Sequence, residues 1–334
     1  MAESGRSDLQ ALVIVEEILP HTVMTVQATF AIRLLASSLI LIPAVFGLVL
    51  QTLLGIALYK GWKTFRENSF YLITVQLMWC DICALLLDLY AAFPLILTGV
   101  EYMGDSIPLY YLPLAFEGIA FNGIFMLSLF LTVNRFLIFL FPAVHAKIFT
   151  TFGTKIMSAF VWIYVFTLIA LSNFFGCRKE FSKEFFYFWY HCQISDEQSF
   201  DYKEFLYTHS YVIPCIMIIM YIAIYIRVKL YRRGLKVNSK TSLKQEMKYL
   251  VQTVLICILI AVEVAAFIFL PFLGIDGYGQ FYVNMLLNLI LIANNLMTPI
   301  VILSFNVDVR QQLKGAFFRQ SRTASLLSTT FSLS

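Results

Sequence analysis

Apolar runs of about 20 residues or more alternate with short polar segments along almost the whole chain. A hydropathy window of about 19 residues separates seven such runs. They cover residues 34–59, 70–97, 109–141, 155–175, 208–228, 250–273 and 281–305. Because a helix needs about 20 apolar residues to cross a bilayer, the pattern predicts an all-α fold in which seven transmembrane helices form one bundle.

Composition supports a membrane protein and excludes two other classes. The chain has 334 residues, of which 60% are hydrophobic and only 13% are charged, whereas soluble domains average about 25% charged residues. So few charges cannot cover the surface of a soluble enzyme of this length. The net charge of +4 comes from basic residues beside the apolar runs, so it marks topology and not a nucleic-acid partner.

The distribution of lysine and arginine predicts the orientation in the bilayer. With the N-terminus outside, 18 of the 24 basic residues lie on the cytoplasmic side and six lie outside. Basic residues accumulate in cytoplasmic segments. We therefore expect a multi-pass plasma-membrane protein with its N-terminus outside and its C-terminus in the cytoplasm. A sensory cilium is one candidate location.

The pattern divides the chain into four segments. Residues 1–33 are expected to form an extracellular N-terminus, and residues 34–305 the transmembrane bundle. Residues 306–319 carry apolar side chains at helical spacing, which predicts an amphipathic eighth helix on the cytoplasmic membrane surface. Residues 320–334 are rich in serine and threonine, typical of a disordered tail. Candidate phosphorylation sites there are Ser321, Thr323 and Ser325.

Four acidic residues lie inside the apolar runs, namely Asp81, Asp88, Glu117 and Glu263. A carboxylate is costly there unless it faces the bundle interior or is neutralised. Asp81 and Asp88 are seven residues apart in the chain, so they share a helix face and lie about 10 Å apart along the axis. These acids are therefore candidates for function.

Cysteine usage predicts one disulfide and no metal site. Cys177 and Cys192 both lie in the second outer loop, where the compartment is oxidising. Their bridge would close a loop of about 15 residues and supply about 3 kcal/mol of stability. A zinc site that uses His191 is the rival interpretation, but these three side chains lack the usual fourth ligand. We expect no cofactor, and no motif favours an enzyme.

Four short motifs, in the right helices and in chain order, resemble those of the rhodopsin-like G-protein-coupled receptors. They are Leu77-Met78-Trp79-Cys80-Asp81 for Leu-Ala-x-x-Asp, Asn134-Arg135-Phe136 for Asp-Arg-Tyr, Phe269-Leu270-Pro271 for Trp-x-Pro, and Thr298-Pro299-Ile300-Val301-Ile302 for Asn-Pro-x-x-Tyr. The residues of these motifs are more similar to those of the nematode serpentine chemoreceptors, in particular the srx-like branch. There, Asn-Arg-Phe ends helix three, and a pair such as Phe305-Asn306 follows the helix-seven proline.

The resemblance implies roles at the cytoplasmic face and in the bundle core. Arg135 and Asn134 would form the switch that couples to a heterotrimeric G protein, aided by the helix bends at Pro271 and Pro299. Asp81 matches the sodium-site aspartate of the family, and Asn294 matches its partner on helix seven. The alternatives are an ordinary positive-inside anchor for Arg135 and a hydrogen-bonded core acid without an ion for Asp81.

The resemblance also indicates a ligand site near the outer mouth. Glu117 lies 18 residues before Arg135, about 27 Å along the helix, and is expected to read the polar end of a ligand. Asp88 and Phe269 complete this candidate site. The alternatives are a locally paired headgroup-level acid for Glu117 and plain aromatic packing for Phe269.

Several positions depart from the family pattern. Asn134 replaces an acidic residue, so the ion pair that usually restrains the arginine is missing. Ile302 replaces the tyrosine and Leu48 the first-helix asparagine, so part of the switching water network has no side chains. Residues 109–116 contain no cysteine, so the usual loop-to-helix disulfide cannot form.

Together these features predict a G-protein-coupled receptor, specifically a chemosensory receptor for a small molecule. Ligand binding in the outer third would move helix six and uncover the cytoplasmic G-protein site. A receptor of the same fold for a short peptide or neuropeptide remains an alternative. A polytopic transporter or ion channel is the alternative of another class, which the lack of an internal repeat disfavours.

Overall fold

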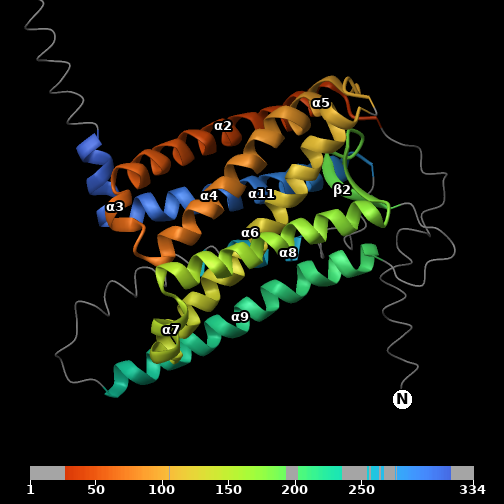
Figure 1. Cartoon of the computed structure of the whole chain (residues 1–334). Helices are drawn as coiled ribbons and strands as arrows, with labels where there is room; N and C mark the ends of the chain where they lie inside the picture. Colours follow the sequence, from red (N-terminus) through yellow and green to blue (C-terminus); the bar gives the residue numbers. More distant parts are fainter. Residues whose placement is uncertain are drawn as a thin grey trace, which may run out of the picture.

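Long helices that lie side by side form the molecule (Figure 1). The computed structural model describes residues 27–104, 106–192, 202–234, 254–255, 257–262, 265–266, 275 and 277–316. The helices are α2 (Phe30–Lys60), α3 (Trp62–Phe65), α4 (Ser69–Leu87), η1 (Asp88–Ala92), α5 (Phe93–Thr98), η2 (Ile107–Tyr111), α6 (Leu112–Leu140), α7 (Pro142–Ile148), α8 (Thr151–Phe174), α9 (Tyr202–Gly234) and α11 (Tyr278–Phe305). The strands β1 (Cys177–Ser182) and β2 (Tyr187–Cys192) form an antiparallel hairpin at one end of the bundle. We call this end the outer end, because the sequence predicts that it lies outside the cell.

Six helical segments of the described part are long and apolar enough to cross a membrane. They correspond to the first five predicted runs and the seventh, and each helical segment begins shortly before its apolar run. Of the sixth run, 250–273, the structure describes only short helical pieces at 254–255, 257–262 and 265–266. Glu263, Phe269 and Pro271 lie outside the described residues.

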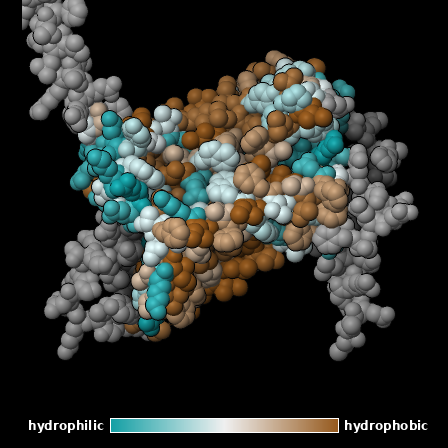
Figure 2. All heavy atoms as spheres, in the orientation of Figure 1, coloured by the Kyte–Doolittle hydropathy of each residue, from teal (hydrophilic) through white to brown (hydrophobic). Residues whose placement is uncertain are grey.

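The helices differ in how much protein surrounds them. In the most apolar window of η2–α6 and of α11, 56% of the residues are buried, against 28% for α2, α8 and α9. The segment η2–α6 is therefore central, and α6 packs against α4, α8 and α9. Hydrophobic side chains cover the middle of the visible face, and the most hydrophilic ones gather at its two ends (Figure 2), as expected for a bundle that crosses lipid.

Two prolines account for the wide π-helical turns η1 and η2 at the outer end. Pro94 and Pro113 lack the N–H that would reach the carbonyl four residues earlier, and their rings crowd it. The carbonyl of Tyr90 instead accepts a hydrogen bond from the Tyr102 hydroxyl at 2.9 Å. The carbonyl of Leu109 accepts one from the Tyr90 hydroxyl at 2.8 Å. Side chains thus satisfy the groups that the prolines release, as apolar surroundings require.

Residues 307–316 are helical and lie within the range 306–319 where an eighth helix is predicted. Asn306 begins this helix, because its Oδ1 accepts from the backbone N–H groups of Asp308 and Val309 at 3.1 and 3.2 Å. Its Nδ2 donates to the Tyr71 hydroxyl at 2.6 Å, which ties the helix to α4. A position on the membrane surface stays a prediction. The predicted tail, with Ser321, Thr323 and Ser325, lies outside the described residues.

We expect Asn306→Ala to destabilise the helix at 307–316 by about 1 kcal/mol, the usual value of such a cap. Faster hydrogen–deuterium exchange of its backbone amides in lipid discs is the measurement. Tyr71→Phe removes the hydroxyl contact to Asn306 and leaves the Asn306 side chain in place as the cap, so it should accelerate exchange less. Equal exchange in Asn306→Ala and the wild type would contradict the assigned cap.

Candidate functional site

The β1–β2 hairpin closes over the outer end of the bundle. Cys177 pairs with Cys192 in the strand register, and a disulfide joins them, as the sequence predicted. Two residues after Cys177 on β1, Lys179 lies directly opposite Tyr190 of β2. Since alternate strand residues share a face, Lys179 and Tyr190 point to the same side as the disulfide. β1 packs against α6 and α8, so this side faces the helices.

Glu117, the predicted ligand residue, is paired with a lysine of the hairpin. The Nζ of Lys179 forms a salt bridge with the Oε2 of Glu117. The two side chains are only 7% and 11% exposed, respectively. In this conformation Glu117 therefore has a charged partner within the protein, and its contact with a ligand stays a prediction. A buried pair of this kind costs much to break, because either charge alone would remain desolvated.

Three aromatic rings surround the same ammonium group. The Nζ of Lys179 lies 4.5 Å from the ring centroid of Phe121, 5.3 Å from that of Tyr190 and 5.9 Å from that of Phe188. A cation within about 6 Å of a ring centroid is attracted by the negative face of the ring. Glu117 and the three rings thus form a cage for a cation, which we call the outer cage.

Asp88 contributes a second acidic group to this region. It is the first residue of the π-helical turn η1, and its carboxyl group interacts electrostatically with Glu117 and Lys179. The structure therefore brings together Asp88 and Glu117, two of the three predicted ligand residues. Phe269, the third, is not among the described residues. Two acidic side chains therefore lie in the region of one lysine, and Glu117 is the one that forms the salt bridge with it.

The sequence did not identify Lys179, Phe121, Phe188 or Tyr190 as site residues. Lys179 counted only as one of the outer basic residues, and the aromatic residues were hidden among 32 phenylalanines and 18 tyrosines. An alternating pattern in the loop was the available signal, since the inward residues Lys179 and Phe181 of β1 meet Tyr190 and Phe188 of β2. That signal becomes useful only when the strand register is known.

A small cavity adjoins the outer cage between α6, α8 and β1. Its volume is about 10 Å³, room for about one water molecule. The lining residues are Tyr111, Ala115, Gly118, Ile169, Ser172, Asn173, Arg178, Lys179 and Tyr190. Asn122 donates to the hydroxyl of Tyr190 at 3.5 Å, and burial raises the pKa of that phenol. With Lys179 in place, this cavity is too small for a molecule larger than water.

The tip of the hairpin is fixed deep in the bundle. Phe186 is fully buried and has a positive φ of 64°, an unusual conformation for a bulky residue. Two asparagines of α11 hold its turn, since the Nδ2 of Asn284 donates to the carbonyl of Phe185 at 2.6 Å and that of Asn288 donates to the carbonyl of Phe186. The backbone of the hairpin therefore has little freedom to move.

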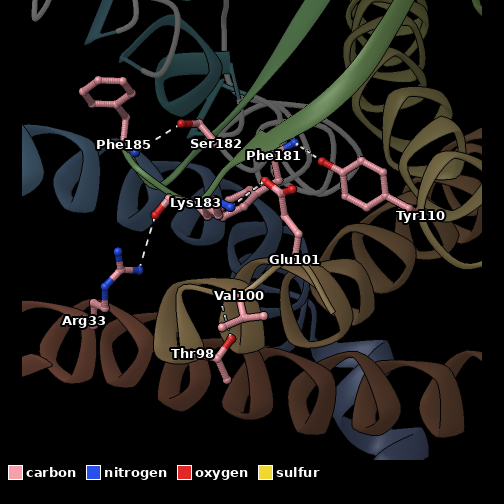
Figure 3. Close-up of polar contacts among 9 residues, drawn as sticks. All are labelled: Arg33, Thr98, Val100, Glu101, Tyr110, Phe181, Ser182, Lys183 and Phe185. Atoms are coloured by element: carbon pink, nitrogen blue, oxygen red, sulfur yellow. Dashed lines mark hydrogen bonds and ion pairs between the residues drawn. The ribbon is translucent and has the colours of Figure 1, made fainter. Parts of the chain in front are cut away.

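Polar contacts with the helix ends hold the outer side of the hairpin (Figure 3). Arg33 of α2 donates to the carbonyl of Lys183 at 3.4 Å, and the Nζ of Lys183 lies 3.0 Å from the Oε1 of Glu101. The backbone N–H of Phe181 donates to the hydroxyl of Tyr110 at 3.0 Å. The hairpin thus joins α2, the turn that follows α5, and η2.

Asp81 occupies the middle of the bundle and is 1% exposed. The Nε2 of Gln51 donates to its Oδ2 at 3.0 Å, and Thr298 also hydrogen-bonds to it. Gln51 donates in addition to the carbonyl of Asn295 at 3.1 Å. Pro299 cannot supply a donor to that carbonyl, so Gln51 joins the proline bend of α11 to Asp81.

The predicted partner of Asp81, Asn294, is also buried. The hydrogen bonds recorded for the Asp81 carboxylate come from Gln51 and Thr298, which the sequence had not assigned to this site. The described residues contain no group of three or more His, Cys, Asp or Glu side chains that could hold a metal ion. Sodium binding at Asp81 stays a prediction.

At the end of the bundle opposite the hairpin, which is predicted to be cytoplasmic, Arg135 is 2% exposed, and its guanidinium carbon lies 4.8 Å from the ring centroid of Phe70. It is therefore not in the headgroup position of an exposed anchor in this conformation. The Nδ2 of neighbouring Asn134 donates to the Oγ of Ser69 at 3.0 Å and lies 3.1 Å from the Nε2 of His145. Asn134 thus connects α6 with α4 and α7, although it cannot form the acid–arginine pair of the receptors that its motif resembles.

Comparison with known proteins agrees with this architecture. Residues 41–306 match the family model described as serpentine type 7TM GPCR chemoreceptor Srx. The match covers most of the chain, including both the outer cage and the buried arginine. No curated protein matches the chain.

Proposed function

The chain belongs to the Srx family of serpentine seven-transmembrane chemoreceptors, and from this premise we propose that it binds a small molecule at the outer cage and signals through a heterotrimeric G protein. As a receptor of the bilayer it would have its N-terminus outside and its C-terminus in the cytoplasm. The outer disulfide fits this orientation, because disulfides persist in oxidising compartments. A sensory cilium remains a candidate location.

One observation carries the proposal. A single central helix, α6, bears the caged Glu117 near its outer end and the buried Arg135 near its inner end. Eighteen residues separate them, about 27 Å of helix. A change in the contacts of Glu117 therefore acts on the same rigid element that holds Arg135.

The middle of the bundle offers a second route between the two ends. Gln51, Asp81 and Thr298 join α2, α4 and α11 beside the Pro299 bend. A ligand shifts the equilibrium between an inactive and an active state of the receptor only by binding the two states with different affinity. A shift from 1:99 to 99:1 needs about 5.5 kcal/mol of that difference. We propose that outward movement of helix six, at Pro271, then uncovers Arg135 for the G protein.

Arg135→Ala tests the proposal in cells that express the full chain and are exposed to a library of small organic compounds. We expect at least one compound to activate a G protein through the wild type, and the response to fall at least tenfold in the variant, about 1.4 kcal/mol of coupling. Lys147→Ala, which removes an exposed base of α7, is the matched control and should respond like the wild type. Equal responses of Arg135→Ala and wild type at equal surface expression would refute the assigned role.

The same cells separate a receptor from a transporter or channel. A receptor response requires the G protein and produces no current or uptake of its own. Current or uptake that persists without any G protein would favour the transporter or channel.

A further inference from the structure

Side-chain contacts, and not a covalent bond, attach the tip of the hairpin, residues 183–186, to α11. The Nδ2 of Asn284 donates to the carbonyl of Phe185 at 2.6 Å, and the Nδ2 of Asn288 donates to the carbonyl of Phe186. Both asparagines belong to α11 and are buried. The disulfide lies at the other end of the two strands, so the tip can detach from α11 while the strands stay linked.

A second helix, α2, holds the same tip through Arg33 (Figure 3). The guanidinium donates to the carbonyl of Lys183 at 3.4 Å, and its carbon lies 5.6 Å from the ring centroid of Phe186. A further hydrogen bond, to the carbonyl of Ile96 at 3.2 Å, positions this arginine. Since α2 and α11 pack against each other, the tip bridges the outer ends of two neighbouring helices.

The attachment keeps one residue in an unfavourable conformation. Phe186 has a φ of 64°, where the Cβ of a bulky residue crowds the backbone. Such a conformation persists only where the surroundings enforce it. Here the ring is fully buried at 5.2 Å from the ring centroid of Phe281, and Asn288 holds the carbonyl. The strain favours release of the tip, so the attached and released states differ by less free energy than the contacts alone would give.

We propose that the tip is a releasable strap, which holds α11 against α2 in the resting receptor and lets the outer end of α11 move when it detaches. This inference rests on the proposed function and assigns a regulation to it. The disulfide keeps the hairpin intact during release, so the strap can attach again.

The position of α11 matters because this helix also reaches the middle of the bundle. Thr298, ten residues after Asn288, hydrogen-bonds to Asp81. Gln51 of α2 donates to the carbonyl of Asn295 at 3.1 Å. The strap at the outer end and Gln51 in the middle therefore join α2 and α11 at two levels. Release of the strap leaves the inner contact in place, and the outer part of α11 can then move about it.

Removal of both amide donors tests the attachment. Asn284→Leu together with Asn288→Leu nearly preserves the side-chain volume but leaves two carbonyls of the tip without partners. In the full chain in lipid discs, we expect hydrogen–deuterium exchange of the tip amides to be about tenfold faster than in the wild type. Leu286→Ala, at an exposed position of the same helix, is the matched control and should exchange like the wild type.

Two substitutions at Phe186 test the strain separately from the packing. Phe186→Ala and Phe186→Gly both remove the ring, but only glycine adopts a φ of 64° without strain. We expect the tip amides to exchange about threefold faster in Phe186→Ala than in Phe186→Gly. Equal exchange in the two variants would overturn the balance on which the strap depends.

A distance measurement shows whether release moves α11, and it needs no G protein. Spin labels are attached at Phe30→Cys and Tyr278→Cys, the exposed first residues of α2 and α11. The exposed free cysteine is removed by Cys215→Ser. We expect one distance between the labels in the otherwise unchanged chain. The variant without the two asparagines should show a second distance.

Signalling shows whether the movement is regulatory. Without any compound, the variant that lacks both asparagines should activate the G protein about threefold more than the wild type, since the released state is more populated. Arg135→Ala added to this variant should cancel the rise.

The possible results separate the strap from the proposed function. Unchanged exchange of the tip, or one unchanged distance in the variant without the asparagines, would overturn the inference. So would released α11 without a rise in activation, in cells where the wild type responds to a compound, and the receptor function would then stand. If the wild type never activates a G protein, the proposed function fails, and the exchange and distance measurements still decide whether the strap holds α11.

Discussion

Replacing Cys177 and Cys192 together by serine is expected to release the hairpin and abolish the response to small molecules. The bridge closes a loop with a sequence separation of 15 residues, worth about 3 kcal/mol in the chain-entropy model. It also fixes the register that sets Lys179 opposite Tyr190. Without it, the strands separate more often, and the outer cage loses two of its walls.

Hydrogen–deuterium exchange of the backbone amides of β1 and β2 measures this release directly. A stabilisation of about 3 kcal/mol corresponds to exchange that is faster by about two orders of magnitude in the double variant. Replacing both cysteines avoids a lone thiol that could form wrong bridges. Cys215→Ser, at an exposed free cysteine, is the control and should change neither exchange nor response. Unchanged exchange in the double variant would mean that the helix contacts alone hold the hairpin.

A fall in cytoplasmic pH below about 6.5 is expected to raise G-protein activation in the absence of ligand. Burial and, next, the charge of Arg135 lower the pKa of His145 from its ordinary value of 6.5. His145 is therefore neutral at pH 7, and its Nε2 can accept from the Nδ2 of Asn134 at 3.1 Å. Protonation of the Nε2 of His145 places its N–H against the Nδ2 donor of Asn134. It also places a second positive charge near Arg135.

The direction of this pH effect on activation follows from proton linkage. A histidine whose pKa is lowered in the closed state stabilises that state above the ordinary pKa. As the pH falls below 6.5, the open state takes up the proton first, so the equilibrium shifts towards it. The shift increases until the pH reaches the lowered pKa of the closed state, where both states are protonated.

Nucleotide exchange on a purified G protein, at pH 7.5 and 6.0, is the measurement. His145→Gln keeps a hydrogen-bond acceptor but does not titrate, so its activity should be the same at both values. Asn134→Ala removes the contacts to Ser69 and His145, each worth about 1 kcal/mol, and should raise basal activation up to about 30-fold at pH 7.5. A pH response in His145→Gln as large as in the wild type would show that another group is responsible.

The membrane spans were predictable from sequence because hydropathy along the chain reflects the surrounding solvent directly. A run such as 109–141 is apolar wherever it packs, so its helix could be located without knowing its neighbours. The bridge between Cys177 and Cys192 was predictable for a similar reason, since it followed from the compartment of their loop. The hairpin itself was not predicted, although it forms the outer lid of the bundle.

The partners of the buried acids could not be predicted from the sequence. It marked Glu117 and Asp88 as costly in lipid and left open whether a ligand or a neighbour compensates them. The partner, Lys179, is 62 residues further along the chain and reaches Glu117 because the strand register turns it inward. The partners of Asp81, Gln51 and Thr298, come from two other helices in the same way.

What the sequence by itself determined is therefore the medium of each segment, namely which residues form apolar spans, and the family that the motifs resemble. Only the tertiary structure decided the pairing: that Lys179 fills the outer cage, that Gln51 joins Asp81 to the Pro299 bend, and that Asn134 contacts His145. Hydropathy is a property of one residue and its medium, whereas a buried charge or hydrogen bond depends on a second residue that the fold alone brings near.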